Sequence, residues 1–395
     1  MGLVEAVKPI AELPDKPRPY ILALDGVRFL AIVVVILKHT GLNATSSFLP
    51  LRLLGSMVKI GGGVPLFFII SGYLISGILL DTRSSENRYR NFMARRSLRI
   101  FPLYFAYLFL AVALTWLTTS TPLHSIWVFV FYLQNIFLVR ADNFGAVLPV
   151  FHLWTLGVQE QFYFAWPFLL WSCSSLRRVR SLCWGIVLGS ILIRIFLTIH
   201  LGEFALAERL MPCRAGEMCL GTLLAVERYE ETWISRIGPK LMAPLSVLLI
   251  VLVIRHTERG NVGMLFVEEV LALLAACLLA GALVPASRTS RFLSHRVFIT
   301  IGGKYSYGLF MFHPVVLLLF CGKVLHLGNT SMAGVERVAV TLAGSLVLAV
   351  LSYHFFEKPF LSLKRYFPAR QKQRTSAPYV SPGVPASAYQ HLQAS

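Results

Sequence analysis

LDGVRFLAIVVVILKH, residues 24–39, is a helix-length apolar run that carries a cation and an imidazole. Arg28 and His39 stand eleven positions apart, so on an α-helix they share one face, about three turns or roughly 16 Å apart along the axis. Ionisable side chains in a membrane-length helix are costly unless they face a bundle interior or a water-filled cavity. The run therefore predicts a functional pair on a membrane helix. The alternative is that Arg28 snorkels to one membrane surface while His39 lies at the other.

The composition is that of a membrane protein. Hydrophobic residues make up 56% of the 395 residues and charged residues only 14%, against about 25% charged in soluble domains. Apolar runs of about twenty residues recur along the chain, which predicts an all-α polytopic membrane protein. The net charge of +18 does not indicate a nucleic-acid partner, because the basic residues gather in short loops between apolar runs and follow the positive-inside rule.

About ten transmembrane helices are expected, with both termini in the cytoplasm, because the strongly basic loop over residues 83–99 places itself and the N-terminus inside. The apolar stretch 126–139 is too short to cross and suits an interfacial or re-entrant piece. The expected spans cover residues 20–41, 61–80, 100–118, 152–172, 182–200, 210–226, 241–254, 264–284, 302–321 and 338–356.

This pattern divides the chain into a cytoplasmic N-terminal segment (1–19), a transmembrane domain (20–360) and a tail (361–395) that is first basic and then disordered. The first segment has no apolar core, so it is not a cleavable signal peptide. The six cysteines form no CxxC pair, and most lie in or beside apolar runs. They are expected to be buried small hydrophobic residues, and no metal site is predicted.

A basic cluster follows the second expected span. Arg95, Arg96 and Arg99 lie within about one turn of a helix that would start near residue 92. Guanidinium groups bind phosphate bidentately. The cluster therefore predicts a phosphate site, unless its charges only set topology and contact anionic lipid.

HLWTLGVQEQFY, residues 152–163, contains a carboxylate that is costly to bury without a cationic partner, Glu160. His39 is expected at a similar depth in the membrane. A carboxylate beside it would orient the imidazole and raise its basicity, as a general base requires. The alternative is a structural ion pair without chemistry.

Two later stretches carry weaker signals. In GKYSYGLFMFH, residues 303–313, Ser306, Phe310 and His313 share one helical face, where a core histidine is the plainer interpretation. Glu357 ends the last expected span, and it could equally pair with the basic loop that follows.

Together these stretches resemble the bacterial acyltransferase 3 family of integral-membrane O-acyltransferases over about residues 22–360. The opening run is similar to the family's LDGLRxxA stretch and places its Arg-x10-His at Arg28 and His39. Five more stretches resemble family patterns in order: GVPLFFIISGYLIS (GVxLFFxLSGFLI), RRSLRIFPLY (RRxxRIxPxY), FHLWTLGVQEQFYFAWP (HxWSLxVEExFYxxxP), SYGLFMFH (SYxxYLxH) and FFEKPF (xxExPF). The further candidate site residues in these stretches are Asp25, Ser71, His152, Trp154, Tyr307, His313 and Glu357.

Two positions depart from the family pattern. Gln159 stands where the family has the first Glu of its VEE, which leaves Glu160 as the only carboxylate there, and Phe310 replaces a usual Tyr. Glu160 is taken as the one that matters because it keeps the charge.

The resemblance implies an O-acyltransferase of the bacterial inner membrane that uses cytoplasmic acetyl-CoA or another acyl-CoA as co-substrate, with no permanently bound cofactor. His39 would be the general base on an acceptor hydroxyl, a step typically worth ~10²–10⁴-fold. Glu160 would position the imidazole, and Arg28 would lie along the donor path. The residues that would bind the phosphates are Arg95, Arg96 and Arg99. The acceptor would be an envelope saccharide, a lipid-linked sugar or a secreted small molecule such as a macrolide.

Two rival functions remain at this point. A proton-coupled transporter would use His39, Glu160 and His313 as a proton relay. An inactive family member would act as a scaffold in the envelope, an interpretation that the departures at Gln159 and Phe310 leave open. Acyl-CoA turnover that is lost in His39→Ala distinguishes the enzyme from both.

Overall fold

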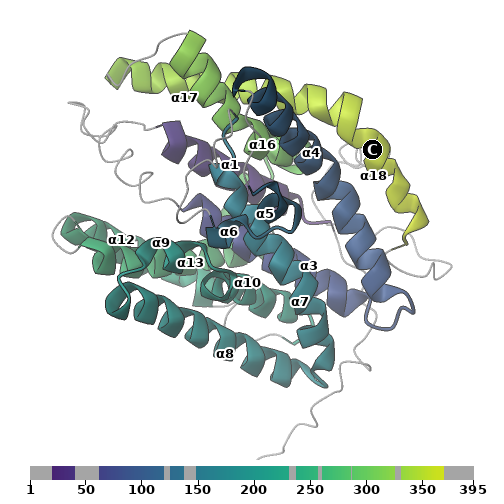
Figure 1. Cartoon of the computed structure of the whole chain (residues 1–395). Coiled ribbons are helices and arrows are strands. Elements are labelled where there is room, and N and C mark those ends of the chain that lie inside the picture. Colours follow the sequence, from purple (N-terminus) through teal and green to yellow (C-terminus); the bar gives the residue numbers. More distant parts are fainter. Residues whose placement is uncertain are drawn as a thin grey trace, which may run out of the picture.

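The computed structural model describes residues 20–40, 62–119, 125–137, 148–230, 237–256, 260–285, 287–324 and 331–368, and every regular element within them is a helix (Figure 1). The α-helices are α1 (Leu22–Thr40), α3 (Gly63–Asp81), α4 (Arg88–Thr119), α5 (Ile126–Val130), α6 (Gln134–Phe137), α7 (Trp154–Ser172), α8 (Leu176–Ile195), α9 (Phe204–Arg209), α10 (Met211–Val226), α12 (Met242–His256), α13 (Gly260–Leu283), α14 (Arg288–Leu293), α15 (Arg296–Thr300), α16 (Ser306–Val315), α17 (Ser331–Ser352) and α18 (Lys358–Ser362). Shorter 3₁₀ or π segments are η2 (Phe151–Leu153), η3 (Phe196–His200), η4 (Gly238–Leu241), η5 (Ile301–Tyr305), η6 (Val316–Val324), η7 (Tyr353–Glu357) and η8 (Leu363–Tyr366).

Several of these helices match a membrane in length and composition. In the described residues, five are long and apolar enough to cross: Gly63–Asp81, Arg88–Thr118, Leu176–His200, Gly263–Leu283 and Gly334–Tyr366. The prediction of an all-helical fold is confirmed for the described residues, and these five helices agree with a membrane protein. The count of about ten spans and the cytoplasmic placement of both ends stay predictions. The expected N-terminal segment 1–19 and most of the expected tail, 369–395, lie outside the described residues.

The stretch expected not to cross the membrane is broken in the structure. Its described part forms two short helices, α5 and α6, separated by Tyr132 in the left-handed region (φ 56°). A span needs about 20 residues, so neither helix crosses. Tyr132 stacks on Tyr104 of α4 with ring centroids 4.5 Å apart, which packs this segment against the bundle.

The centre of the bundle is the crossing of α3 and α10, where two glycines let the backbones touch. A Cβ on Gly72 would lie 1.8 Å from the carbonyl oxygen of Met218, and one on Gly221 would lie 1.9 Å from that of Ile69. Small residues of this kind are how membrane helices approach closely. A buried hydrogen bond of 2.7 Å between Ser76 and Thr222 joins the same two helices.

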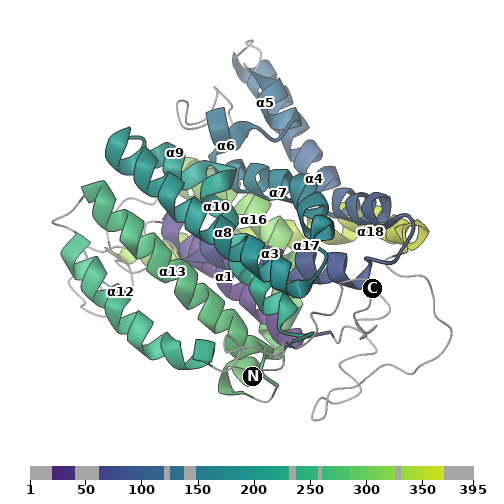
Figure 2. The same ribbon diagram turned by 90° about the horizontal axis from the view of Figure 1, so that it is seen from below.

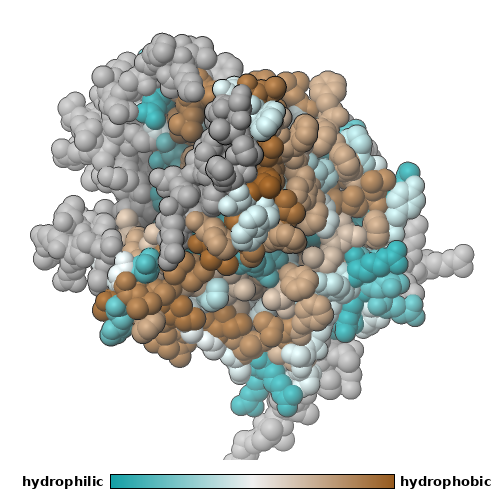
Figure 3. All heavy atoms as spheres, in the orientation of Figure 1, coloured by the Kyte–Doolittle hydropathy of each residue, from teal (hydrophilic) through white to brown (hydrophobic). Residues whose placement is uncertain are grey.

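The helix α1 runs through the middle of the molecule, with α12 and α13 on one side and α4 and α18 on the other (Figure 2). Its first turn packs closely against η5, because a Cβ on Gly302 would lie 1.8 Å from the carbonyl oxygen of Asp25. The outer surface suits lipid. Phe109, Leu117 and Phe164 are more than half exposed, and on the face seen in Figure 3 hydrophobic residues predominate between hydrophilic patches at the edges.

Candidate active site

The cation of the opening pair is fixed at the start of α1. The Arg28 guanidinium donates to the Asp25 carboxylate at 2.5 Å, one helical turn away, and the Tyr20 hydroxyl donates to the same carboxylate. Asp25 is 3% exposed, so an arginine partner offsets the cost of burying its charge. Asp25 therefore orients Arg28 from within the same helix.

Arg28 lines a cavity of about 120 Å³, together with Arg96 and Arg99 of α4. We call it the arginine cavity. Its other polar lining residues are Ser71, Thr155, Gln159, Tyr163, Ser306 and Tyr307. The Asp25 and Glu357 charges act on Arg99, so the three guanidinium groups lie in one partly neutralised cluster. Such a cluster can hold phosphate oxygens.

The third arginine of the predicted phosphate site does not line this cavity. Arg95 points to the end of the chain's last described helix, where its Nη1 donates to the carbonyl oxygens of Lys364 and Phe367, both at 3.1 Å. A cation at a helix C-terminus satisfies carbonyls that lack helical partners. The structure therefore gives Arg95 a structural environment, while Arg96 and Arg99 face the cavity.

The imidazole of the opening pair contacts a second imidazole. His39 Nδ1 lies 3.0 Å from His313 Nε2, and the two rings stack with centroids 5.1 Å apart. His313 is fully buried, and its Nδ1 lies 2.8 Å from the carbonyl oxygen of Phe310. Pro314 has no N–H to give to that carbonyl, so the imidazole N–H takes its place.

This chain of contacts fixes the tautomers of the neutral rings. A carbonyl oxygen only accepts, so His313 Nδ1 must carry the proton and its Nε2 is a bare acceptor. His39 Nδ1 must then be the donor between the rings. The remaining nitrogen, His39 Nε2, therefore has a free lone pair, which is the requirement for accepting a proton from a substrate.

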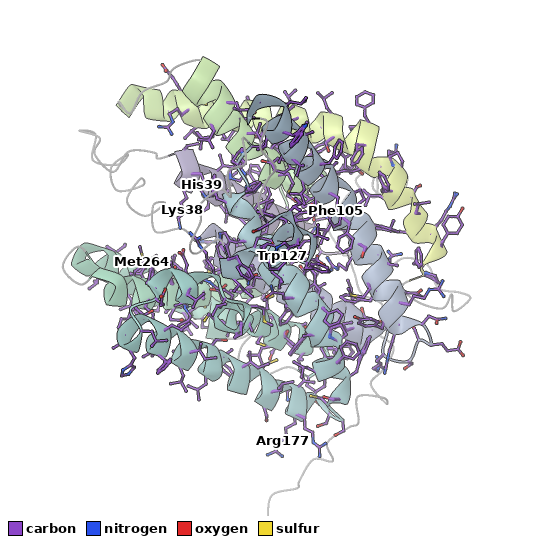
Figure 4. All side chains as sticks on the ribbon, in the orientation of Figure 1. Lys38, His39, Phe105, Trp127, Arg177 and Met264 are labelled. Atoms are coloured by element: carbon purple, nitrogen blue, oxygen red, sulfur yellow. The ribbon has the colours of Figure 1, made fainter. Side chains whose placement is uncertain are left out.

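His39 lines a second cavity, of about 270 Å³, which we call the histidine chamber. His152, Trp154, Arg214 and Glu268 are also in its lining. Figure 4 shows Lys38 and His39 at the end of α1 that lies on the same side as Met264 of α13, while Arg177 lies at the far end of the molecule. The chamber thus belongs to the opposite end of α1 from Arg28.

The two cavities share a wall. Val35, Val64, Thr155 and Phe310 line both of them. Phe310 is the position where the sequence departs from the usual Tyr, and its carbonyl is also the anchor of His313. A molecule that fills the arginine cavity would therefore end against the residues that border His39.

The expected contact between Glu160 and His39 is not present. No hydrogen bond or ion pair joins these two described residues, and His313 occupies the position at His39 Nδ1. Glu160 is 8% exposed, and its Oε1 has no hydrogen-bond partner among the described residues. The cation that acts on it is Arg96, which places Glu160 with the arginines.

Of the remaining candidates, Ser71 and Tyr307 line the arginine cavity and His152 lines the histidine chamber, whereas Glu357 lines neither. The Gln159 amide donates to the Ser71 hydroxyl at 3.0 Å beside the arginine cavity, and the Tyr307 hydroxyl donates to the carbonyl oxygen of Ile100 at 2.8 Å. His152 is 2% exposed and meets the His313 ring edge-on at 5.6 Å. Glu357 accepts from the Ser352 hydroxyl at 2.9 Å. No cluster of described residues could hold a metal ion.

A buried ionic network was not anticipated from the sequence. Arg194 of α8 binds Glu268 and Glu269 of α13, while Arg214 of α10 binds Glu217 at 2.7 Å and Glu268 at 3.1 Å. All five residues lie inside expected spans. Ionisable residues in spans are a functional signal, and this signal could have found the network.

The chain matches the acyltransferase 3 family, described as an acyltransferase domain, over residues 21–354. Because this match covers most of the 395 residues, the protein belongs to that family, and the resemblance drawn from the motifs is confirmed.

Its relatives in three bacteria are named as O-acetyltransferases. YrhL of Bacillus subtilis (strain 168), provisionally named a peptidoglycan O-acetyltransferase, is 29% identical over 374 residues, which cover 86% of this chain and 55% of YrhL. The peptidoglycan O-acetyltransferase OatA of Listeria monocytogenes is 26% identical over 376 residues, or 87% of this chain and 56% of OatA. SACOL0978 of Staphylococcus aureus (strain COL), provisionally named an O-acetyltransferase, is 25% identical over 371 residues, or 87% and 58%. The chain spans just over half the length of these relatives, and no solved structure matches it.

Proposed function

We propose that this protein transfers an acetyl or other short acyl group from cytoplasmic acyl-CoA to a hydroxyl of an envelope saccharide or a secreted small molecule, in the bacterial inner membrane. The observation that carries the proposal is the free Nε2 of His39 in a chamber that shares a wall with an arginine-lined cavity. Membership of an acyltransferase family supports the reaction class.

The donor would enter at the arginine cavity. Arg96 and Arg99, with Arg28 beside them, would bind the phosphates of CoA, since guanidinium groups pair with phosphate oxygens. From Arg28 to His39 the distance along α1 is roughly 16 Å. The extended arm of the donor would lie along this path and bring the thioester to the shared wall.

The acyl group then moves in one step. His39 Nε2 takes the proton of the acceptor hydroxyl while that oxygen attacks the thioester carbonyl carbon. The new C–O bond forms, the C–S bond breaks, and the leaving sulfur takes the proton back from His39. The hydrogen bond from His39 Nδ1 to His313 Nε2 holds the ring in place throughout. The products are an acyl ester and free CoA.

The proposal for the acceptor draws on the relatives and on the histidine chamber. Two of the relatives carry peptidoglycan in their names, which favours a saccharide acceptor for this chain as well. The histidine chamber, at the opposite end of α1 from the arginines, is where the acceptor would bind.

The test is acyl transfer by the purified full-length protein in liposomes, with radiolabelled acetyl-CoA and soluble saccharide fragments. We expect His39→Gln to lower turnover by ~10²–10⁴-fold, the worth of a positioned general base, with unchanged affinity for acyl-CoA. His354→Gln is the matched control, because His354 is exposed and contacts Tyr305 outside both cavities. Equal turnover in His39→Gln and wild type, or proton flux without ester formation, would overturn the proposal.

A further inference from the structure

The ionic network contributes two of its members to the lining of the histidine chamber, Arg214 and Glu268. Each of the three guanidinium nitrogens of Arg214 already donates a hydrogen bond: Nη1 to Glu217, Nη2 to Glu268, and Nε to the carbonyl oxygen of Glu208 at 2.6 Å. Three of its five N–H groups are therefore used within the protein. The carboxylates of the network have oxygens that can still accept hydrogen bonds.

Two carboxylates of the network each keep one oxygen without a hydrogen bond to any described residue. Glu268 accepts from Arg194 and Arg214 through Oε2 alone, which leaves Oε1. Glu217 accepts from Arg214 through Oε1, which leaves Oε2. Both side chains are more than nine-tenths buried, but only Glu268 lines the chamber that contains His39. Neither arginine bonds to Oε1 of Glu268, so this oxygen is the one that a ligand in the chamber could use.

We infer that Glu268 is the acceptor-recognition residue, whose Oε1 accepts a hydrogen bond from a second hydroxyl of the acceptor while His39 Nε2 receives the proton of the reacting hydroxyl. This inference rests on the proposed function and narrows its acceptor to a ring-sized group with several hydroxyls. An ionised carboxylate is an acceptor only, so it selects O–H donors.

The rest of the chamber fits such a ring. Phe151 and Trp154 give it aromatic walls, and Val35 and Phe310 close it toward the donor side. Its volume is about 270 Å³, while a cavity of about 150 Å³ already admits benzene. An apolar acceptor with one hydroxyl would make no hydrogen bond to Glu268 Oε1, so we expect it to bind more weakly than a sugar.

The experiment compares Glu268→Gln with Glu217→Gln and Glu269→Gln in the full-length protein. All three remove one charge from the same network, but only Glu268 faces the chamber. The probes are acetyl-CoA with a panel of methyl glycosides and their monodeoxy analogues. For the wild type we expect one monodeoxy analogue to have a KM roughly 10- to 100-fold higher than its parent, the worth of a hydrogen bond to a charged group.

In Glu268→Gln that difference should shrink to a few-fold while the KM for acetyl-CoA stays unchanged, and in Glu217→Gln and Glu269→Gln it should persist. Equal loss of discrimination in all three variants would show that the network is only structural and would overturn the inference. So would a wild type whose acetyl-CoA turnover is accelerated by none of the glycosides. A wild type that never turns over acetyl-CoA instead overturns the proposed function.

Discussion

The arginine cavity and the histidine chamber share four wall residues, yet the charged side chains in their linings differ. In the first, Arg28, Arg96 and Arg99 converge, with the charges of Asp25 and Glu357 acting on the cluster. In the second, the cations Lys38, Arg209 and Arg214 line the same space as the carboxylates Glu208 and Glu268, so both signs of charge meet beside His39. Under the proposed function, the first environment suits the phosphates of the donor, and the second suits the hydroxyl of the acceptor.

The largest effect that we expect concerns His313, which contacts His39 beside the histidine chamber. In His313→Leu, His39 Nδ1 loses its acceptor and the ring can flip or change tautomer, so we expect turnover to fall by about 100-fold, the upper end for loss of a group that orients a histidine. His313→Gln keeps an acceptor oxygen and should restore much of the rate. The measurement is kcat with saturating acetyl-CoA.

The KM for acetyl-CoA should stay unchanged in both His313 variants, because the residue lies away from the arginines. If the leucine and glutamine variants lost the same activity, His313 would be a packing residue and not a positioning residue. A rise in the KM for acetyl-CoA would mean that His313 also affects donor binding, which would contradict the division of roles between the two cavities.

A smaller effect tests the donor side through two neighbouring arginines. Arg96→Ala removes a guanidinium that faces the cavity, so we expect the KM for acetyl-CoA to rise about tenfold, the worth of one charge-assisted hydrogen bond. Arg95→Ala is the matched control, since its guanidinium binds the carbonyl oxygens of Lys364 and Phe367. It should lower thermal stability and leave that KM unchanged. The reverse ranking would mean that the donor binds outside the arginine cavity.

The smallest effect concerns the shared wall. Phe310→Ala would open a connection between the cavities and admit water to the thioester, because closed sites protect reactive groups from hydrolysis. We expect acetyl-CoA hydrolysis without acceptor to rise, by less than the change in Arg96→Ala, and Phe310→Tyr to leave it low. Release of free CoA in the absence of saccharide measures both. Unchanged hydrolysis in the alanine variant would argue that Phe310 does not separate the two cavities.

The position of a residue along a helix axis could be predicted from the sequence, whereas the direction in which its side chain points could not. The eleven-position spacing put Arg28 and His39 at separate ends of one helix face, and each now lines a cavity. Arg95 and Arg96 could not be distinguished, because adjacent positions differ by a rotation that only packing fixes. The partner of Arg95 lies near residue 364, and no local sequence pattern predicts a contact between residues so far apart in the chain.

The partner of His39 was misassigned for a related reason. His152 and Trp154 line the histidine chamber, and Glu160 stands six residues beyond Trp154, about 9 Å further along the helix. The start of the motif therefore reaches the chamber that contains His39, but its carboxylate does not. His313 was a candidate site residue, but a core histidine was the plainer interpretation of it. Its contact with His39 can be recognised only once α1 and α16 are known to lie side by side.

The glycine contact between α3 and α10 has a consequence for both cavities. Gly72 follows Ser71, which lines the arginine cavity, and α10 carries Arg214, which lines the histidine chamber. A side chain larger than hydrogen at Gly72 or Gly221 would push these helices apart. One substitution at this helix contact would therefore alter the width of both cavities together.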